Sequence, residues 1–578
     1  MNKTIYEQFL TKQYKVRKAE NIRELVLESA RIYRKRTAFY LKEAKGSYIR
    51  ITYERMKNDY LTLANTFISM GLKNKPIAVT GINSYEWAIT YLAASTVGIV
   101  VPLDKEISIE DMTGFIEASE AEALIADEKY LLKLQKTVNR QGFIFIRTRE
   151  ESDNTDTESI ASLISADSTQ YGQGNTEAET MPIDRDESKI LIFTSGTTGN
   201  AKGVCLSHRN ICANIMSVSK MVKIKSKDKV LSILPLHHTY ECTLGFLKII
   251  YSGACITFCD GLRYIYRNIG EYHPSVIVTV PLLLEKVSQK LEDSVRENIP
   301  AKYKEKTKDM VFSELLRALP FYIQIVIKRK VKNSLGGRLH TFIVGAAGID
   351  KEIVEQLSFL GVRVLQGYGL TECSPLLAGN NDFFVKSDST GLPIHDVDIK
   401  IFEPNSEGVG EIIARGENIM RGYYRDPEAT EAVIRDGWFH TGDLGYLDEN
   451  GFLYITGRSK NVIITKNGKN IYPEEIESRL YGNKLVADAI IIGASGSEDV
   501  FVKAKILPNL EAIKEALQVA VPTKEEIHEI IRNAVEEIND KLPSYKRIKS
   551  FIIRDREFEK TTTQKIKRFG ENISDEKQ

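Results

Sequence analysis

The stretch from Ile190 to His208 constrains the fold more than any other part of this chain. It reads I-L-I-F-T-S-G-T-T-G-N-A-K-G-V-C-L-S-H. The apolar run Ile190–Phe193 is short and bounded by turn residues, which is typical of a buried strand. The loop after it is rich in hydroxyls and glycines and is followed by Lys202. Glycines allow close approach to a phosphate, hydroxyl and N–H groups donate to its oxygens, and lysine offsets its charge. The stretch therefore predicts a phosphate-binding loop.

Two common phosphate loops are excluded at this position. Walker A requires G-x-x-x-x-G-K-[ST], but Ala201 stands five residues after Gly196, where the second glycine would be needed. The dinucleotide pattern G-x-G-x-x-G is also absent. An ordinary surface loop is the alternative, although such loops rarely gather hydroxyls, glycines and a lysine directly after a buried strand.

The size and charge of the chain limit its class. Its 578 residues predict two to four domains, and its 42% hydrophobic and 27% charged residues are ordinary values for a soluble protein. The formal net charge of +1 predicts no strong attraction to nucleic acid, and there is no arginine-rich arm or zinc-finger spacing. We therefore expect no nucleic-acid partner.

Cysteine usage and hydropathy indicate a cytoplasmic protein. None of the six cysteines forms a C-x-x-C pair, and the first ten residues contain no signal-peptide core. Trp87–Leu103 is the strongest membrane candidate, but it is shorter than a usual span and interrupted by Gly98 and Pro102. We interpret it as a buried helix followed by a strand, and expect at most peripheral membrane contact.

The N-terminal part alternates strands and helices. Apolar runs at Ile77–Thr80 and Val97–Leu103 flank a helix that ends near Ala94 and that Asn83 or Ser84 can cap. Strand, helix and strand in this order form a βαβ unit, which implies a parallel sheet covered on both faces.

Glycine-rich or polar loops recur after apolar strands in the second α/β region. Thr341–Val344 leads into Gly345–Gly348, and Val362–Leu365 leads into Gly367–Glu372. Ligands of open α/β sheets bind beyond the carboxyl ends of strands. We therefore expect these loops and the loop after Phe193 to share one cleft.

Two segments carry no predicted chemistry of their own. Residues 147–187 are acidic and polar, which is typical of a solvated connector. Residues 301–338 interleave lysines with apolar side chains. A helical excursion with an ordinary core face is the favoured interpretation there, and a membrane-surface or partner-binding helix is the alternative.

After Ser389 the pattern changes to short alternating strands, and beyond Arg458 to a lysine-rich stretch and a compact α+β tail. The predicted fold class is α/β. Two doubly wound subdomains, residues 1–185 and 186–388, and a small β-rich lobe, residues 389–458, form a large N-terminal domain. A smaller, mobile α+β domain follows at residues 459–578.

Five motifs together resemble the acyl-adenylate-forming, or AMP-binding, enzymes. They are T-S-G-T-T-G-N-A-K-G-V (194–204), Y-G-L-T-E (368–372), T-G-D (441–443), G-R-S-K-N-V-I-I-T-K-N-G-K-N-I-Y-P-E-E-I-E (457–477) and T-T-T-Q-K-I-K-R (561–568). Each alone is moderate evidence, but all five in the family's order and spacing are highly specific. The resemblance covers nearly the whole chain and is strongest to long-chain fatty acyl-CoA synthetases.

The resemblance implies how ATP and Mg²⁺ would be held. Thr371 would contact the α-phosphate, Glu372 would bind Mg²⁺ together with Thr194, Asp443 would accept both ribose hydroxyls, and Arg458 would contact the nucleotide. The outer phosphates would lie on Thr194, Ser195, Gly196, Thr197, Thr198, Gly199 and Lys202. Adenine would lie beside Gly345, Ala346, Ala347, Gly348, Tyr368 and Gly369.

The resemblance also implies a mobile C-terminal domain. Lys565 would bridge the substrate carboxylate and the α-phosphate, Lys460 would be the hinge, and Gly468 would lie beside the pantetheine arm of coenzyme A. The chain departs from the family pattern at Gln564, where a glycine is usual before the catalytic lysine, and at Glu559, where a proline is common.

The segment P-L-H-H-T-Y-E at 235–241 resembles the family's P-x-x-H wall of the acyl site, with His238 as the matching histidine. An ordinary structural histidine is an equal alternative. The pair His237 and His238 shows no third metal ligand in the sequence, so we expect no zinc site.

The implied activity is an ATP-dependent acid–thiol ligase that makes a fatty acyl-adenylate and passes the acyl group to coenzyme A. A ligase that loads an acyl carrier protein is one alternative, since basic regions suit an acidic carrier. A non-catalytic acyl- or nucleotide-binding homologue is the other, although Lys202, Glu372, Asp443, Arg458 and Lys565 are all intact.

Overall fold

The fold is that of a computed structural model, which divides into two compact units. Unit 1 comprises Met1–Ile399, Ala414–Phe439 and Asn450–Phe452, and unit 2 comprises Lys400–Ile413, His440–Glu449 and Leu453–Gln578. The structure describes residues 4–42, 46–149, 157–167, 176–194, 201–308, 310–345, 348–464, 469–495, 500–560, 566–568 and 572–573.

Unit 1 contains a seven-stranded sheet in the order β18-β8-β7-β4-β3-β5-β6. Its central strands β7, β4, β3, β5 and β6 run parallel, and β8 and β18 add antiparallel pairs at one edge. The strands are β3 (Pro76–Thr80), β4 (Ile99–Pro102), β5 (Ala123–Ala126), β6 (Ile144–Arg147), β7 (Ser188–Thr194), β8 (Lys202–Ser207) and β18 (Gly422–Tyr423).

Unit 1 also contains a nine-stranded sheet in the order β15-β14-β13-β12-β11-β9-β10-β1-β2. Strands β13 to β1 in this order are parallel, and both edges end in antiparallel strands. They are β1 (Thr37–Lys42), β2 (Tyr48–Thr52), β9 (Lys229–Ser232), β10 (Cys255–Phe258), β11 (Val276–Thr279), β12 (Thr341–Val344), β13 (Arg363–Gly369), β14 (Leu376–Gly379) and β15 (Leu392–Pro393).

The predicted βαβ unit is confirmed. Helix α4 (Tyr85–Val97) connects β3 to the parallel strand β4, and the Ser84 side chain caps it by accepting from the backbone N–H of Trp87. Nearly every residue of α4 is buried, as expected of a helix that is apolar on all sides. The segment 87–103 is therefore part of the interior of unit 1.

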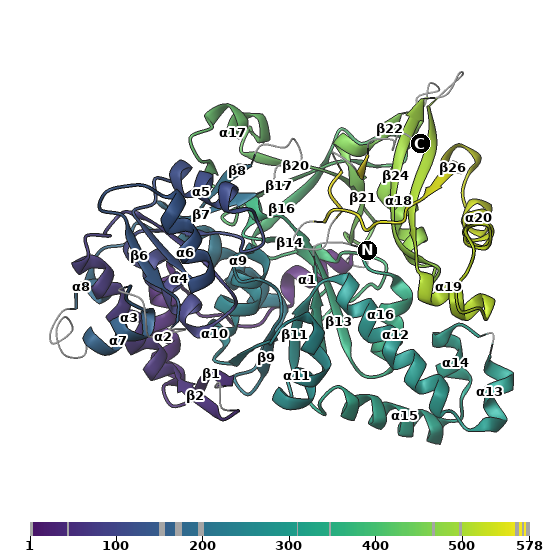
Figure 1. The fold of residues 1–578 in the computed structure, drawn as a ribbon, viewed down its shortest axis with the longest axis horizontal. Coiled ribbons are helices and arrows are strands. Elements are labelled where there is room, and N and C mark those ends of the chain that lie inside the picture. The colour runs from purple at the N-terminus through teal and green to yellow at the C-terminus, as the bar shows by residue number, and fades with distance from the viewer. Residues whose placement is uncertain are drawn as a thin grey trace. The chain divides into compact units, whose positions relative to one another are not determined.

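The other helices of unit 1 pack around the sheets (Figure 1). They are α1 (Ile5–Thr11), α2 (Ile22–Tyr33), α3 (Tyr53–Ser69), α5 (Ile109–Ala118), α6 (Glu128–Thr137), α9 (His208–Met221), α10 (Lys248–Ser252), α11 (Ile265–Tyr272), α12 (Pro281–Asn298), α16 (Lys351–Phe359), α17 (Pro427–Val433), the π-helix η1 (Glu241–Leu247) and short 3-10 turns at Leu262–Tyr264 and Thr371–Cys373. No helix in the described part of the chain is both long and apolar enough to span a membrane.

The predicted connector is partly folded, which corrects its description as a purely solvated segment. It contains α7 (Ile160–Asp167) and α8 (Glu177–Thr180). Ile160 and Leu163 are buried because they supply the apolar side chains that pack α7 onto the domain. Residues 150–156 and 168–175 lie outside the described part.

The basic region forms three helices, α13 (Ala301–Thr307), α14 (Phe312–Ala318) and α15 (Phe321–Ser334). Their labels lie close together at the lower right of Figure 1, in teal. Ile323, Ile327 and Val331 of α15 are buried in one apolar cluster with the side chains of α12 and α16. The core face of the favoured interpretation is present in α15, and this finding leaves open what its outer face contacts.

Unit 2 is built on a three-stranded sheet of β24 (Val486–Ser495), β25 (Val500–Pro508) and β26 (Ile548–Ile553). Helices α18 (Pro473–Tyr481), α19 (Leu510–Leu517) and α20 (Lys524–Asp540) share its apolar core. Short strands precede this sheet in the sequence, namely β16 (Val397–Phe402), β17 (Gly410–Gly416), β19 (Ile434–Arg435), β20 (Trp438–Leu447), β21 (Leu453–Arg458), β22 (Ile463–Ile464) and β23 (Asn470–Ile471). Of these, β19 and parts of β16, β17 and β20 belong to unit 1. The expected run of short strands after Ser389 and the α+β tail are both present.

Candidate active site

The predicted phosphate loop lies at the tip of a hairpin in unit 1. Strands β7 and β8 pair antiparallel up to Thr194 and Lys202, and the Thr194 hydroxyl donates to the Lys202 carbonyl at 3.4 Å. The loop residues Ser195, Gly196, Thr197, Thr198 and Gly199 lie outside the described residues. The hairpin therefore fixes both ends of the predicted loop, at Thr194 and at Lys202.

Three side chains meet beside this hairpin: Lys202, Glu372 and Tyr423. The Lys202 ammonium lies 4.7 Å from the centre of the Tyr423 ring, and the Tyr423 hydroxyl donates to Glu372 Oε1 at 3.0 Å. Strand β18 pairs with β8 and so places Tyr423 opposite Val204. One tyrosine thus brings a cation and a carboxylate to the same edge of the sheet.

The surroundings of this trio restrict its movement. The Met420 N–H donates to the Glu372 carbonyl at 2.7 Å, which ties the segment before Tyr423 to the 3-10 turn that also holds Thr371. Burial first, and then the charge of Glu372, raise the pKa of the Tyr423 hydroxyl. Tyr423 therefore stays protonated and acts as a hydrogen-bond donor to the carboxylate.

The residues expected beside adenine lie on neighbouring strands. Strand β13 continues as far as Gly369, so Tyr368 is a strand residue opposite Ala378 rather than a loop residue as the sequence had suggested. A Cβ on Gly369 would lie 1.9 Å from the Pro375 carbonyl oxygen, so only glycine fits there. Gly345 directly follows the adjacent strand β12, while Ala346 and Ala347 are outside the described part.

Asp443 and Arg458 form an ion pair in unit 2. They face each other across strands β20 and β21, with Arg458 Nε 3.0 Å from Asp443 Oδ1. Thr441 supports the turn by accepting from the Asp443 N–H at 3.1 Å. Asp443 is buried, whereas Arg458 is partly exposed. The ion pair holds the Asp443 carboxylate and the Arg458 guanidinium next to each other in unit 2.

The predicted hinge and catalytic lysine also belong to unit 2. Lys460 is exposed in the 3-10 turn Ser459–Asn461. Gly468 and Lys565 lie outside the described residues. The described residues on the two sides of Lys565 end at Lys560 and resume at Ile566, and an isolated β-bridge pairs these two residues.

A buried cavity lies behind the strand ends of unit 1. Its lining is mostly apolar and includes Met221, Tyr240, Leu244, Lys248, Leu365 and Gly367. Gly367 is the residue before Tyr368, so the cavity adjoins the strand expected to meet adenine. Its volume of about 20 Å³ is room for about one water molecule, so the cavity as it stands does not hold an aliphatic chain.

Two ionisable groups are buried near this cavity. Glu241 accepts a hydrogen bond from Ser232 at 2.6 Å, and burial raises the pKa of its carboxyl to about 8. The Lys248 ammonium donates to Ser219 Oγ and the Val222 carbonyl at 3.3 and 3.1 Å, and burial lowers its pKa to about 8. Neither was singled out as a site residue, because a burial-driven pKa shift cannot be seen in a sequence.

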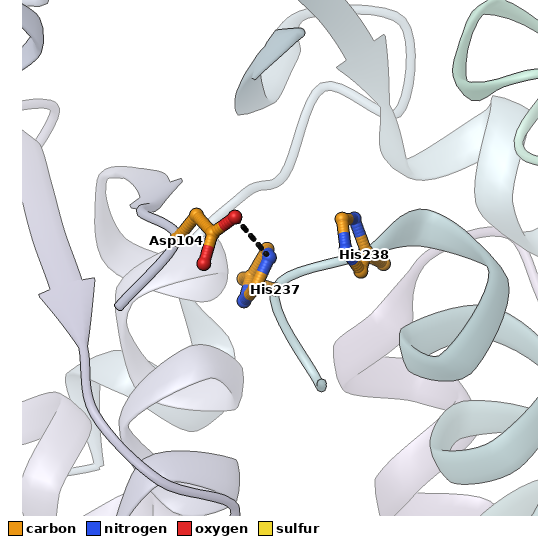
Figure 2. A group of neighbouring side chains, drawn as sticks. All are labelled: Asp104, His237 and His238. Atoms are coloured by element: carbon orange, nitrogen blue, oxygen red, sulfur yellow. Dashed lines mark ion pairs between the residues drawn. The ribbon is translucent and has the colours of Figure 1, made fainter. Parts of the chain in front are cut away.

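The histidine pair has a third neighbour, which corrects the expectation that it lacks one. Asp104 follows strand β4, and His237 and His238 follow strand β9. Figure 2 shows Asp104 pointing toward His237, with His238 beside it, and one ligand atom from each residue lies within 4.8 Å of the others. The sequence separation of Asp104 hid this proximity, since it arises only when the two sheets pack.

Tyr423 is the other residue that the sequence analysis missed. It lies in the dipeptide Tyr423-Tyr424 on a strand of two residues, too short to show an alternating pattern. The only signal was that two adjacent aromatic residues follow Arg421-Gly422 without being part of an apolar run.

Comparisons with known proteins identify the family. The model of the AMP-binding enzyme family matches residues 26–424, and that of the AMP-binding enzyme C-terminal domain matches residues 460–570. A chloroplastic long-chain-fatty-acid–[acyl-carrier-protein] ligase from Arabidopsis thaliana is 26% identical over 556 residues, covering 83% of this chain and 74% of that protein. A long-chain-fatty-acid–CoA ligase from Mycobacterium bovis is 28% identical over 477 residues, covering 78% and 77%.

Solved structures show the same fold. The o-succinylbenzoate CoA synthetase of Bacillus subtilis, in complex with its acyl-adenylate intermediate, superimposes with a TM-score of 0.70 at 22% identity and covers 94% of this chain and 96% of that one. The two family models together match most of the sequence. The motifs at 194–204, 368–372 and 561–568 lie within the matched regions, 457–477 spans the start of the second, and 441–443 lies between the two. This chain belongs to the AMP-binding enzyme family.

Proposed function

We propose that the chain activates a medium-to-long aliphatic fatty acid with ATP and transfers the acyl group to the thiol of coenzyme A. The observation that carries the proposal is the trio Lys202, Tyr423 and Glu372, which holds an ammonium and a carboxylate beside a predicted phosphate loop. The similarity to fatty-acid ligases supports an aliphatic acid.

The donor set fits a magnesium nucleotide. Mg²⁺ prefers one or two carboxylates together with phosphate oxygens, which suits Glu372 with a hydroxyl such as that of Thr194. When bound, the ion would neutralise charge on the phosphates. Lys202 would add a cation, and Asp443 is an acceptor suited to ribose hydroxyls, although Arg458 already occupies one of its oxygens.

The reaction has two steps. A carboxylate oxygen attacks the α-phosphorus, the bond to the β-phosphate oxygen breaks, and pyrophosphate leaves. The thiol sulfur then attacks the acyl carbon, the bond to the AMP oxygen breaks, and the thiol proton is released. We assign Lys565 to the first step, where a cation reduces repulsion between two anions, and Gly468 to the path of the pantetheine arm in the second.

Two finer points belong to this proposal. We infer that Lys460 is the hinge for movement of residues 459–578 between the two steps, and that the protein works in the cytoplasm, which its six free cysteines support. An acyl carrier protein is the second candidate acceptor, because the Arabidopsis thaliana relative is named as a ligase for one.

The test separates the two half-reactions in the Lys565→Ala variant. We expect acid-dependent ATP–pyrophosphate exchange to be abolished, while supplied acyl-adenylate and coenzyme A still give thioester, since a group that stabilises one transition state affects one step. The matched control is Lys567→Ala, which removes a charge two residues away. Equal loss of both steps in Lys565→Ala, with folding intact, would refute this assignment.

The substrates are tested with a panel of acids and two thiols. Fatty acids should drive exchange better than amino or benzoic acids, and coenzyme A should be consumed in preference to a pantetheinylated carrier protein. Faster exchange with an aromatic or amino acid would refute the aliphatic substrate. Thioester formation on the carrier alone would establish the second acceptor.

A further inference from the structure

The group formed by Asp104, His237 and His238 carries an inference beyond fatty-acid activation. His237 is 7% exposed, and its Nε2 atom is buried without a hydrogen-bond partner among the described residues. Asp104 Oδ2 lies 3.6 Å from that nitrogen, which is too long for a hydrogen bond. Buried polar atoms in folded proteins nearly always have a hydrogen-bond partner, so a buried ring nitrogen without one needs an explanation.

A divalent metal ion would explain this spacing. Bonds of about 2.1 Å in a tetrahedral site place neighbouring ligand atoms about 3.4 Å apart. The separation of Asp104 and His237 is close to that value, and the three ligand atoms together lie within 4.8 Å. Figure 2 shows Asp104 and His238 beside His237, and tetrahedral coordination would require the three ligand atoms to approach from within 4.8 Å to about 3.4 Å of one another.

The backbone around the three residues is already fixed. Asn83 holds the turn before His237, because its side chain accepts from the Leu236 N–H at 3.0 Å and donates to the Leu234 carbonyl at 2.7 Å. The Glu106 N–H donates to Asp104 Oδ1 at 2.9 Å, and Oδ2 is the oxygen nearer His237. Such supporting contacts orient metal ligands in known sites.

We propose that Asp104, His237 and His238 form a binding site for a borderline divalent transition metal, with Zn²⁺ as the reference ion. Two imidazoles and one carboxylate select such ions over Mg²⁺ and Ca²⁺, which prefer oxygen ligands. The ion would connect the carboxyl end of β4 in one sheet to the turn after β9 in the other. Because His238 is the proposed acyl-wall residue, occupancy would also hold its ring in place.

The test measures Zn²⁺ binding directly, without nucleotide or fatty acid, so it does not depend on the proposed function. Chelator-treated full-length protein is titrated with Zn²⁺ in competition with a chromophoric chelator. We expect one site per chain that weakens at least about tenfold in Asp104→Asn and in His237→Asn. All variants keep the six cysteines, so any binding of Zn²⁺ to thiols contributes equally to every titration.

The control is His340→Asn. His340 Nε2 also lies 3.6 Å from an aspartate oxygen, that of Asp228, but no second histidine joins this pair among the residues described. We expect His340→Asn to bind Zn²⁺ like the unmodified chain, and circular dichroism to show that each variant is folded. Equal Zn²⁺ affinity in the unmodified chain and His237→Asn would overturn the proposal.

An independent observation concerns the outer face of α15. Phe321 is 76% exposed and Tyr322 60% exposed, and Ile325 and Val326 on the same helix are exposed as well. With 3.6 residues per turn these four side chains cover one side of the helix, opposite the buried Ile323, Ile327 and Val331. Contiguous exposed apolar side chains of this kind mark interaction sites.

The charge next to this apolar face points to the chemistry of its partner. Arg329, Lys330 and Lys332 are exposed on the following turns of α15, and the Tyr322 hydroxyl lies 3.4 Å from that of Tyr303 on the lysine-rich helix α13. An apolar and aromatic face flanked by basic side chains suits a lipid surface with anionic headgroups. We propose that α15 docks unit 1 on an anionic membrane surface, from which an aliphatic acid could also be taken up.

Vesicle sedimentation tests this surface. We expect the full chain to bind vesicles of phosphatidylcholine mixed with phosphatidylglycerol, and Phe321→Ser/Val326→Ser to bind at least about tenfold more weakly. Val521→Ser is the control, because Val521 is an exposed valine at 81% on unit 2. Undiminished binding by the double variant, or no binding of the unmodified chain to these vesicles, would overturn the proposal.

Discussion

Two charged regions of unit 1 differ in how their charges are held. Lys202 and Glu372 are partly exposed at strand ends and meet through the ring and hydroxyl of Tyr423. Glu241 and Lys248 are fully enclosed, and burial is the first cause of both of their pKa shifts. The first region keeps its charges accessible to solvent, whereas the second buries them away from water.

A shifted pKa does not by itself mark a functional site in this protein. The strongest shifts in the second region follow from desolvation, which any packed interior produces. In the first region the informative feature is the convergence of opposite charges at a predicted phosphate loop. Substitutions in the two regions should therefore separate activity from pH-dependent stability.

Glu372→Gln should have the largest effect on acid activation. The amide keeps the shape and the hydrogen bond from Tyr423 but removes the negative charge proposed to bind Mg²⁺, and metal stabilisation of several kcal/mol corresponds to a loss of roughly 10²–10⁴-fold. ATP–pyrophosphate exchange is the measurement. The control, Glu428→Gln, changes an exposed carboxylate of α17. Near-normal exchange at low Mg²⁺ would contradict the role of Glu372.

Tyr423→Phe should reduce activation by about tenfold. A hydrogen bond to a charged group contributes about 1.5–3 kcal/mol, and part of this positions the Glu372 carboxylate. The Mg²⁺ concentration that gives half-maximal exchange should rise, which loss of folded protein alone would not cause. Tyr424→Phe removes the neighbouring hydroxyl and should leave that concentration unchanged.

Glu241→Gln should change activation little but should alter stability strongly with pH. The folded-state pKa of about 8 lies above the unfolded value, so the folded protein binds more protons between about pH 4.5 and 8. Stability of the unmodified chain should therefore fall as pH rises through this window. In the glutamine variant the free energy of unfolding should not show this decrease with pH. Urea unfolding at several pH values measures the difference. Parallel slopes would show that Glu241 is not buried as described.

Lys248→Met should have the smallest effect on activation and the opposite effect on the pH profile. The folded-state pKa of about 8 lies below the unfolded value, so the unfolded chain binds more protons between about pH 8 and 10.4. The unmodified chain should gain stability as pH rises through this window, and the variant should not. Thermal unfolding measured in matched buffers at pH 8 and above checks the sign.

Local patterns predicted much of the fold. Asn83 or Ser84 was expected to cap the helix, and Ser84 caps α4, because a side-chain oxygen before an apolar helix needs no distant partner. The strands at Thr341–Val344 and after Val362 were visible as short apolar runs. The continuation of β13 to Gly369 was not, since it depends on pairing with β14 and on the close approach of Pro375.

The site was predictable where motifs carry chemistry and not where sheets bring distant residues together. Lys202, Glu372 and Asp443 were named from their motifs. Tyr423 reaches Glu372 only because β18 pairs with β8, and Asp104 reaches His237 only because two separate sheets pack. Neither contact leaves a periodic signal, since periodicity reports which face is buried and not what lies opposite it.

The bridge between Lys560 and Ile566 has a consequence for how Lys565 finds its target. Lys560 is also paired with Asp488, and Arg568 is paired with Glu477, so both sides of the segment are fastened to unit 2. A lysine on a free tail would have a low effective concentration at any single phosphate. If Lys565 acts in the first half-reaction as proposed, the rate of that step should also respond to substitutions in the Lys560–Asp488 and Arg568–Glu477 pairs, which are not part of the proposed nucleotide site.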